Sequence, residues 1–158
     1  MSSDNATFPY GMRFYAEVIA HFIEEKELKN VSLVGHSMGG QIAIWLALLK
    51  PSFLENLILC APAGFEVFQP WEKAIFRNAM MFMDFVMDEE QSLKQVLENS
   101  FYHFPESAKD CTAQLMDLLR KKNKKRYRKI LEQCINGMMN EQVYDLLPEI
   151  KCPVQMLF

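Results

Sequence analysis

Residues 30–49, "NVSLVGHSMGGQIAIWLALL", constrain the fold of this chain more than any other segment. The segment begins with an apolar strand pattern, passes through small residues around Ser37 and continues as a strongly apolar helix pattern. Gly35, Gly39 and Gly40 have no side chain, which allows the backbone to bend sharply or to approach another element closely. We therefore expect a tight strand-to-helix turn that holds the Ser37 hydroxyl out at the end of a sheet.

The spacing around this turn is G-x-S-x-G, with His36 and Met38 at the variable positions. Serine between glycines is common in ordinary turns, but the flanking strand and helix favour a nucleophilic serine at Ser37. The backbone N–H of Met38 can then meet a developing oxyanion, whereas we expect His36 to pack or to form a local hydrogen bond. The residues that shape the turn are Gly35, His36, Gly39 and Gly40.

The segments around this turn predict a sheet with helices beside it. Residues 11–27 have the spacing of a one-faced helix, and residues 42–49 are apolar on nearly every position, which is typical of a buried helix. The continuous apolar run 56–64 is typical of a parallel strand that is covered on both faces, and 154–158 is similar. With 31–35 as the first strand, short connections favour a parallel arrangement.

Between the second and third strands, residues 65–147 predict four or five helices and no strand. One stripe at helical spacing consists of Trp71, Ile75, Ala79, Phe82 and Val86. The clearest stripe consists of Tyr127, Ile130, Leu131, Cys134, Ile135 and Met138. We predict an α/β fold with three parallel strands and flanking helices: a core at 1–64, an all-helical insertion at 65–147 and a return to the core at 148–158.

The charge balance excludes no partner class but requires none. The net charge is −3, so neither nucleic acid nor an anionic membrane is expected as an obligatory partner. Residues 120–129 hold eight of the 17 basic residues. We interpret this run as a solvated face, with weak contact to anionic lipid as the alternative.

The cysteines lie far apart, with no C-x-x-C pair and no histidine at metal-ligand spacing, so we expect reduced thiols, no disulfide and no metal. They are Cys60, Cys111, Cys134 and Cys152. The first residues do not resemble a secretory signal, and no apolar run is long enough to span a bilayer. These features favour the cytoplasm, provided that no further residues precede Met1.

Three segments, "LVGHSMGG", "KPSFLENLILCAPAG" and "LPEIKCPVQMLF", together resemble the α/β-hydrolase fold family. The resembling branch carries a helical lid after the sixth strand, and the likeness covers essentially the whole chain. It implies that the three strands are the fifth, sixth and seventh of the sheet, and it implies no cofactor. In the family, the catalytic acid and histidine follow the seventh and eighth strands. The resemblance therefore implies that both lie beyond Phe158 and that a second oxyanion donor precedes Met1.

This chain would then be the middle of a longer hydrolase and nearly inactive by itself, because residual catalysis without acid and base is small. Two residues remain alternatives for the missing roles. Glu66 follows the sixth-strand segment, where a minority of the family places its acid. His103 could act as a base from the insertion, although an aromatic-rich loop favours packing, and His21 is expected at a helix surface.

A serine nucleophile, in place of aspartate, implies acyl transfer in this family. We expect an acyl-enzyme at Ser37 and hydrolysis of a small lipophilic carboxylic ester or related acyl compound. The alternatives are a carbon–carbon bond hydrolase of the same fold and a non-catalytic binding module. The apolar insertion would suit a lipophilic substrate or would be core between lid helices. Its soft residues are Phe76, Met80, Met81, Phe82, Met83, Phe85 and Met87.

Overall fold

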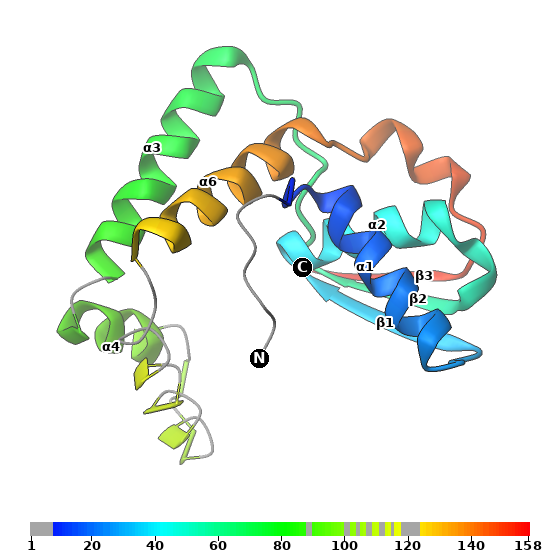
Figure 1. The fold of residues 1–158 in the computed structure, drawn as a ribbon, viewed down its shortest axis with the longest axis horizontal. Coiled ribbons are helices and arrows are strands. Elements are labelled where there is room, and N and C mark those ends of the chain that lie inside the picture. Colours follow the sequence, from blue (N-terminus) through cyan, green and yellow to red (C-terminus); the bar gives the residue numbers. More distant parts are fainter. Residues whose placement is uncertain are drawn as a thin grey trace.

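The computed structural model describes residues 8–87, 90–99 and 124–158, with short stretches between 102 and 117. Along the chain the elements are α1 (Met12–Glu25), β1 (Val31–His36), α2 (Met38–Leu49), η1 (Pro51–Phe53), β2 (Leu54–Cys60), α3 (Pro70–Met87), α4 (Glu90–Asn99), α6 (Lys124–Asn140), η2 (Tyr144–Glu149) and β3 (Val154–Leu157). Figure 1 shows two parts: a sheet with α1 and α2, and an extension of α3, α4 and α6, called here the helical arm.

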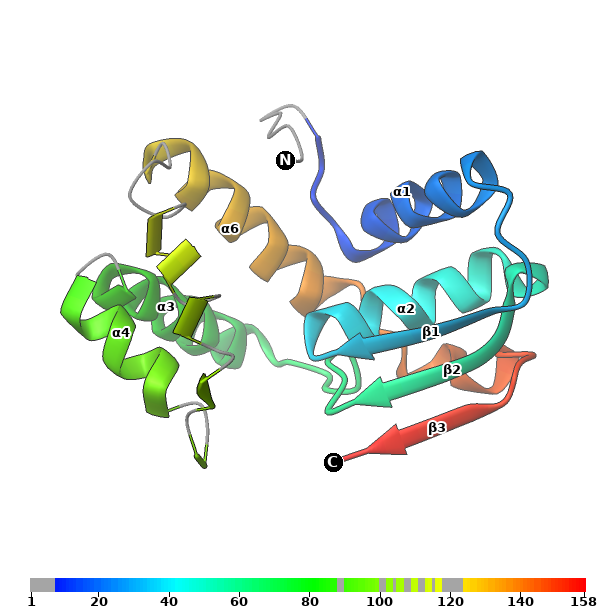
Figure 2. The ribbon, with the colours of Figure 1, turned by 90° about the horizontal axis from the view of Figure 1, so that it is seen from below.

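The sheet has three parallel strands in the order β1-β2-β3, which confirms the predicted parallel arrangement. Residue His36 at the end of β1 is level with Cys60 of β2, and Cys60 is level with Leu157 of β3. The carboxyl ends of all three strands therefore form one edge. Figure 2 shows that the arrowheads at this edge point toward the helical arm.

Helix α2 is buried between the sheet and α1, as its apolar sequence predicts. Ile44 and Leu46 of α2 and Leu57 and Leu59 of β2 have no exposed side-chain surface. Each such side chain contributes about 2 kcal/mol relative to an exposed one. The packing of α2 on β1 and β2 holds the strand-to-helix turn at the carboxyl edge of the sheet.

The sheet is covered on one face, whereas the apolar run 56–64 predicts cover on both. Helices α1 and α2 both lie on the same side (Figure 2). On the other side, Val34 is 62% exposed, Ile58 and Cys60 are only partly buried, and Gln155 and Leu157 of β3, which are level with them, are exposed. The expectation of two-sided cover is therefore wrong for the described residues.

Helix α3 contains the predicted stripe that begins at Trp71, but the described side chains of this stripe face away from the described parts of the protein. Trp71, Ile75 and Phe82 are each more than 60% exposed. The partly buried side chains Phe76 and Met80 lie on another face of the same helix. Helix α3 is apolar on more than one face, so a stripe at helical spacing does not decide which face is buried.

Within the described part of residues 65–147, every regular element is helical. No helix among the described residues is long and apolar enough to cross a membrane. Of the basic run 120–129, residues 120–123 lie outside the described residues and α6 begins at Lys124.

Candidate active site

Ser37 forms the turn between β1 and α2 in a backbone conformation that serine rarely adopts. Its φ is 51° and its ψ is −122°, and such conformations cost roughly 1–3 kcal/mol. The Ser37 N–H donates to the carbonyl of Cys60 at 3.1 Å, and the Ser37 carbonyl accepts from the N–H groups of Ala63 and Gly40, both at 2.9 Å. Bonds to β2, to the loop that follows it and to α2 thus hold the strained turn in place.

The glycines around Ser37 differ in how closely the backbone is packed. A Cβ at Gly35 would lie 2.6 Å from the carbonyl oxygen of Gly39, and a Cβ at Gly40 would lie 2.6 Å from the Cβ of Pro62. No such contact exists at Gly39, where nothing lies within 4 Å. The expected close approach is therefore present at Gly35 and Gly40 and absent at Gly39.

Ser37 is exposed and lines a cavity of about 490 Å³ between the carboxyl edge of the sheet and the helical arm. The walls come from the strand-to-helix turn of residues 35–40, called here the elbow, and from the β2–α3 loop, α3 and α6. The lining residues are Ser37, Met38, Ala61, Pro62, Ala63, Gly64, Glu66, Phe68, Phe76, Met80, Tyr127, Ile130, Leu131, Cys134, Ile135 and Met138. All six residues of the predicted α6 stripe are among them, so this stripe forms a cavity wall.

The backbone N–H of Met38 belongs to the first turn of α2, where helix N–H groups lack acceptors within the helix. Among the described residues, no acceptor outside the helix takes this N–H. A helix N-terminus also favours negative charge. Ser37 and Met38 therefore line the same cavity, at the positive end of α2.

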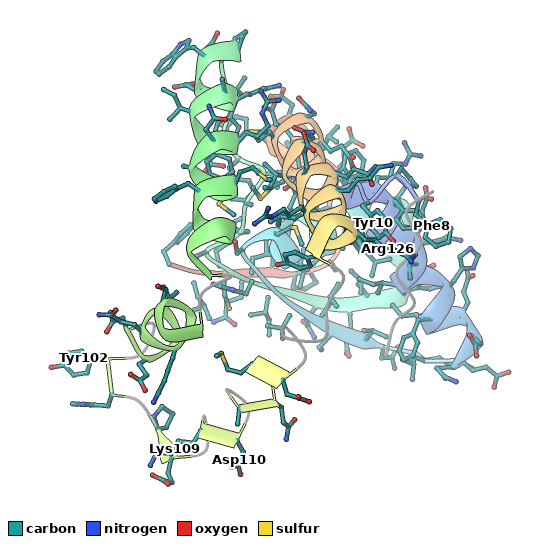
Figure 3. All side chains as sticks on the ribbon, turned by 60° about the vertical axis from the view of Figure 1, so that its left-hand side comes forward. Phe8, Tyr10, Tyr102, Lys109, Asp110 and Arg126 are labelled. Atoms are coloured by element: carbon teal, nitrogen blue, oxygen red, sulfur yellow. The ribbon has the colours of Figure 1, made fainter. Side chains whose placement is uncertain are left out.

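None of the three histidines lines this cavity. His36 is exposed at the end of β1, and His21 lies on α1 with its Nδ1 3.5 Å from Glu24 Oε2. His103 lies beside Tyr102, with ring centroids 4.5 Å apart, and Figure 3 shows Tyr102 in the outer part of the helical arm. The structure thus does not bring a histidine base to Ser37.

The ionisable side chains among the described residues of the cavity wall are Glu66, Tyr127 and Cys134. Burial raises the pKa of the Cys134 thiol, which lies 3.4 Å from the Tyr15 hydroxyl. Burial and the hydrogen bond to Cys134 also raise the pKa of Tyr15. The thiol is therefore neutral at pH 7, and Cys134 belongs to the apolar wall.

A buried glutamine, which sequence reasoning missed, connects the elbow helix to α6. Gln41 is fully buried, and its Nε2 donates to the carbonyls of Met138 at 3.1 Å and Glu141 at 2.7 Å. Trp45 Nε1 donates to the same Glu141 carbonyl at 3.1 Å. The one polar residue in the apolar run 41–49 was a signal for this anchor.

The β2–α3 loop was also missed as a cavity wall. Gly64, with φ of 95°, accepts a hydrogen bond from the N–H of Val143 at 2.9 Å. A Cβ at Gly64 would lie 2.7 Å from the Gln41 side chain. The small residues of "APAG" after the second strand were the available signal, because they let the loop approach α2.

Comparisons with known proteins agree on one fold. A family model described as alpha/beta hydrolase fold matches residues 2–144. A Mycoplasma genitalium protein with an esterase/lipase name is 35% identical over 97 residues, which are 57% of this chain and 36% of that protein. The uncharacterized hydrolase YugF of Bacillus subtilis is 36% identical over 64 residues, 40% of this chain and 23% of that protein.

Solved structures extend the likeness to nearly the whole chain. A probable hydrolytic enzyme from Pseudomonas aeruginosa superposes with a TM-score of 0.77 at 20% identity, over 98% of this chain and 50% of that one. The esterase EaEST from Exiguobacterium antarcticum gives a TM-score of 0.71 at 25% identity, over 96% of this chain and 56% of that one. The chain thus spans about half of these structures and about a third or less of the curated relatives.

Proposed function

Because the chain belongs to the alpha/beta hydrolase fold family, we propose that it supplies the nucleophile and acyl pocket of an esterase. The observation that carries this proposal is the exposed Ser37, held at φ 51° at the carboxyl edge of the sheet and facing the cavity. Strained residues that the surrounding structure holds in place are typical of functional sites. The esterase and hydrolase names among the relatives support the same reaction class.

In this proposal, Ser37 Oγ attacks the carbonyl carbon of a carboxylic ester or related acyl compound. The Met38 N–H stabilises the oxyanion, the alcohol leaves, and water later hydrolyses the acyl-enzyme. A base must accept the hydroxyl proton in the first step, and no histidine lines the cavity. We therefore expect slow turnover from this chain by itself, since residual catalysis without the base is small.

The helical arm acts in this proposal as a lid that supplies the substrate pocket. Phe76 and Met80 of α3 and the α6 stripe give the cavity an apolar wall. A volume of about 490 Å³ lies within the range of pockets for small organic ligands. The expected substrate is thus a small lipophilic ester. Met83, Phe85 and Met87, also expected to contribute, lie outside the residues whose side chains the structure describes.

A fluorophosphonate probe tests this proposal, because it labels an activated serine and leaves ordinary serines unmodified. Because no histidine lines the cavity, we expect slow labelling at Ser37, loss of that labelling in Ser37→Ala, and unchanged labelling in Ser32→Ala, which removes another exposed serine from β1. Mass spectrometry of the labelled peptide gives the site. Labelling that survives in Ser37→Ala would contradict the proposal.

A second candidate is a binding module that retains the pocket without catalysis. The absence of a histidine from the cavity wall favours it. A folded protein that binds lipophilic esters, but whose Ser37 stays unlabelled, would support this candidate. A carbon–carbon bond hydrolase would instead label at Ser37 and cleave a diketone in preference to a simple ester.

A further inference from the structure

Among the described residues that line the cavity beside Ser37, one has a side chain with a formal charge. Glu66 lies in the loop between β2 and α3. Among the described residues that line the cavity it is the only carboxylate, and none of them is a lysine, an arginine or a histidine. The remaining wall is made mainly of aliphatic and aromatic side chains and methionines. Among the described side chains of this wall, Glu66 therefore supplies the formal charge that a bound molecule meets, while the N-terminus of α2 at Met38 adds a partial positive charge at the Ser37 end.

No described group neutralises this carboxylate. The ion pairs and side-chain hydrogen bonds of the described residues do not include Glu66. The nearest basic residue along α3, Lys73, donates instead to Asn140 Oδ1 at 2.6 Å. Glu66 is itself exposed, so its side chain lies where the cavity meets water.

We propose that Glu66 selects substrates by their charge. The cavity then accepts neutral or ammonium-bearing lipophilic esters and disfavours esters with a carboxylate or phosphate. This inference rests on the proposed function of the Ser37 cavity and adds the class of substrate. A like charge close to Glu66 is repelled, and an ammonium group is attracted, more strongly beside an apolar wall than in bulk water. Water at the exposed carboxylate limits the preference to about fivefold.

Competition binding tests this inference without requiring catalysis. Nile red, a neutral apolar dye, reports occupancy of the cavity, and octanol, octylammonium and octanoate displace it with the same eight-carbon chain. At low ionic strength we expect octanoate to bind about fivefold more weakly than octanol, and octylammonium at least as tightly as octanol. The differences should shrink at high salt, because Glu66 is exposed to screening ions.

Variants of matched charge separate a local effect from net charge. Glu66→Gln should bring the three affinities within about twofold, and Glu66→Lys should make octanoate the preferred ligand. Glu55→Gln changes the net charge equally, but at the opposite end of β2, and should leave the wild-type order intact. Circular dichroism confirms that each variant is folded.

An unchanged preference in both Glu66 variants would overturn the inference, and so would failure of all three ligands to displace the dye. Fluorophosphonate labelling of Ser37 is scored separately. Labelling with no charge preference rejects only the role of Glu66. A charge preference without labelling rejects esterase activity and retains a charge-selective binding site.

Discussion

The elbow and the helical arm hold the two sides of one cavity in different ways. At the elbow, backbone groups and glycines are in such close contact that two of the three glycines have no space for a Cβ. In the arm, side chains form the wall, and large apolar residues such as Trp71 and Phe82 remain exposed. Backbone contacts thus fix the position of Ser37, while the side chains of the arm form the cavity wall opposite it.

The largest expected effect tests how closely the elbow is packed. Gly40→Ala places a methyl group 2.6 Å from Pro62 Cβ, so we expect a loss of about 3 kcal/mol in the free energy of unfolding. Gly39→Ala is the matched control: it adds the same methyl group to the same helix where nothing lies within 4 Å. The control should stay within about 0.5 kcal/mol of wild type or gain stability. Urea denaturation measures both, and equal losses would contradict the difference between these sites.

The next effect concerns the connection between the two regions. Gln41→Leu removes two hydrogen bonds to the carbonyls of Met138 and Glu141 and should cost about 2 kcal/mol. The loss is limited because Gln41 Oε1 is already buried without a partner among the described residues. Trp45→Phe removes one bond to the same Glu141 carbonyl and should cost about 1 kcal/mol.

Hydrogen exchange locates this effect. Residues 138–143 should exchange faster in Gln41→Leu than in Trp45→Phe, because Gln41 contributes two bonds to this segment. Equal protection in the two variants would show that other contacts hold α6 against α2.

The strain at Ser37 predicts a smaller change with an unusual sign. Glycine adopts positive φ readily, so Ser37→Gly should be about 1 kcal/mol more stable than Ser37→Ala, which keeps the strained φ of 51°. Both variants remove the hydroxyl and should lose probe labelling equally. Thermal unfolding of the pair measures the difference. A Gly variant no more stable than the Ala variant would show that this φ carries little strain.

The elbow and the α6 stripe could be predicted because local sequence determines them. A strand, small residues and an apolar helix in succession leave few backbone paths, and the α6 stripe is flanked by polar residues on every other face. The exposure of the α3 stripe and the one-sided cover of the sheet could not be predicted, because each depends on which distant segment packs there. Gln41 shows the same limit: its acceptors, at 138 and 141, lie about a hundred residues along the chain.

The smallest effect tests this difference within α3 itself. Phe82 is 64% exposed, whereas Phe76 lines the cavity. Phe82→Ser should therefore change the free energy of unfolding by less than about 0.5 kcal/mol, as substitutions at exposed positions usually do. Phe76→Ser removes a partly buried ring from the cavity wall and should both destabilise the protein, by about 2 kcal/mol, and weaken Nile red binding. Chemical denaturation and dye titration of the two variants decide the point. A larger loss from Phe82 would mean that the outward stripe of α3 is covered in solution, and that the cavity wall is not the stabilising face of this helix.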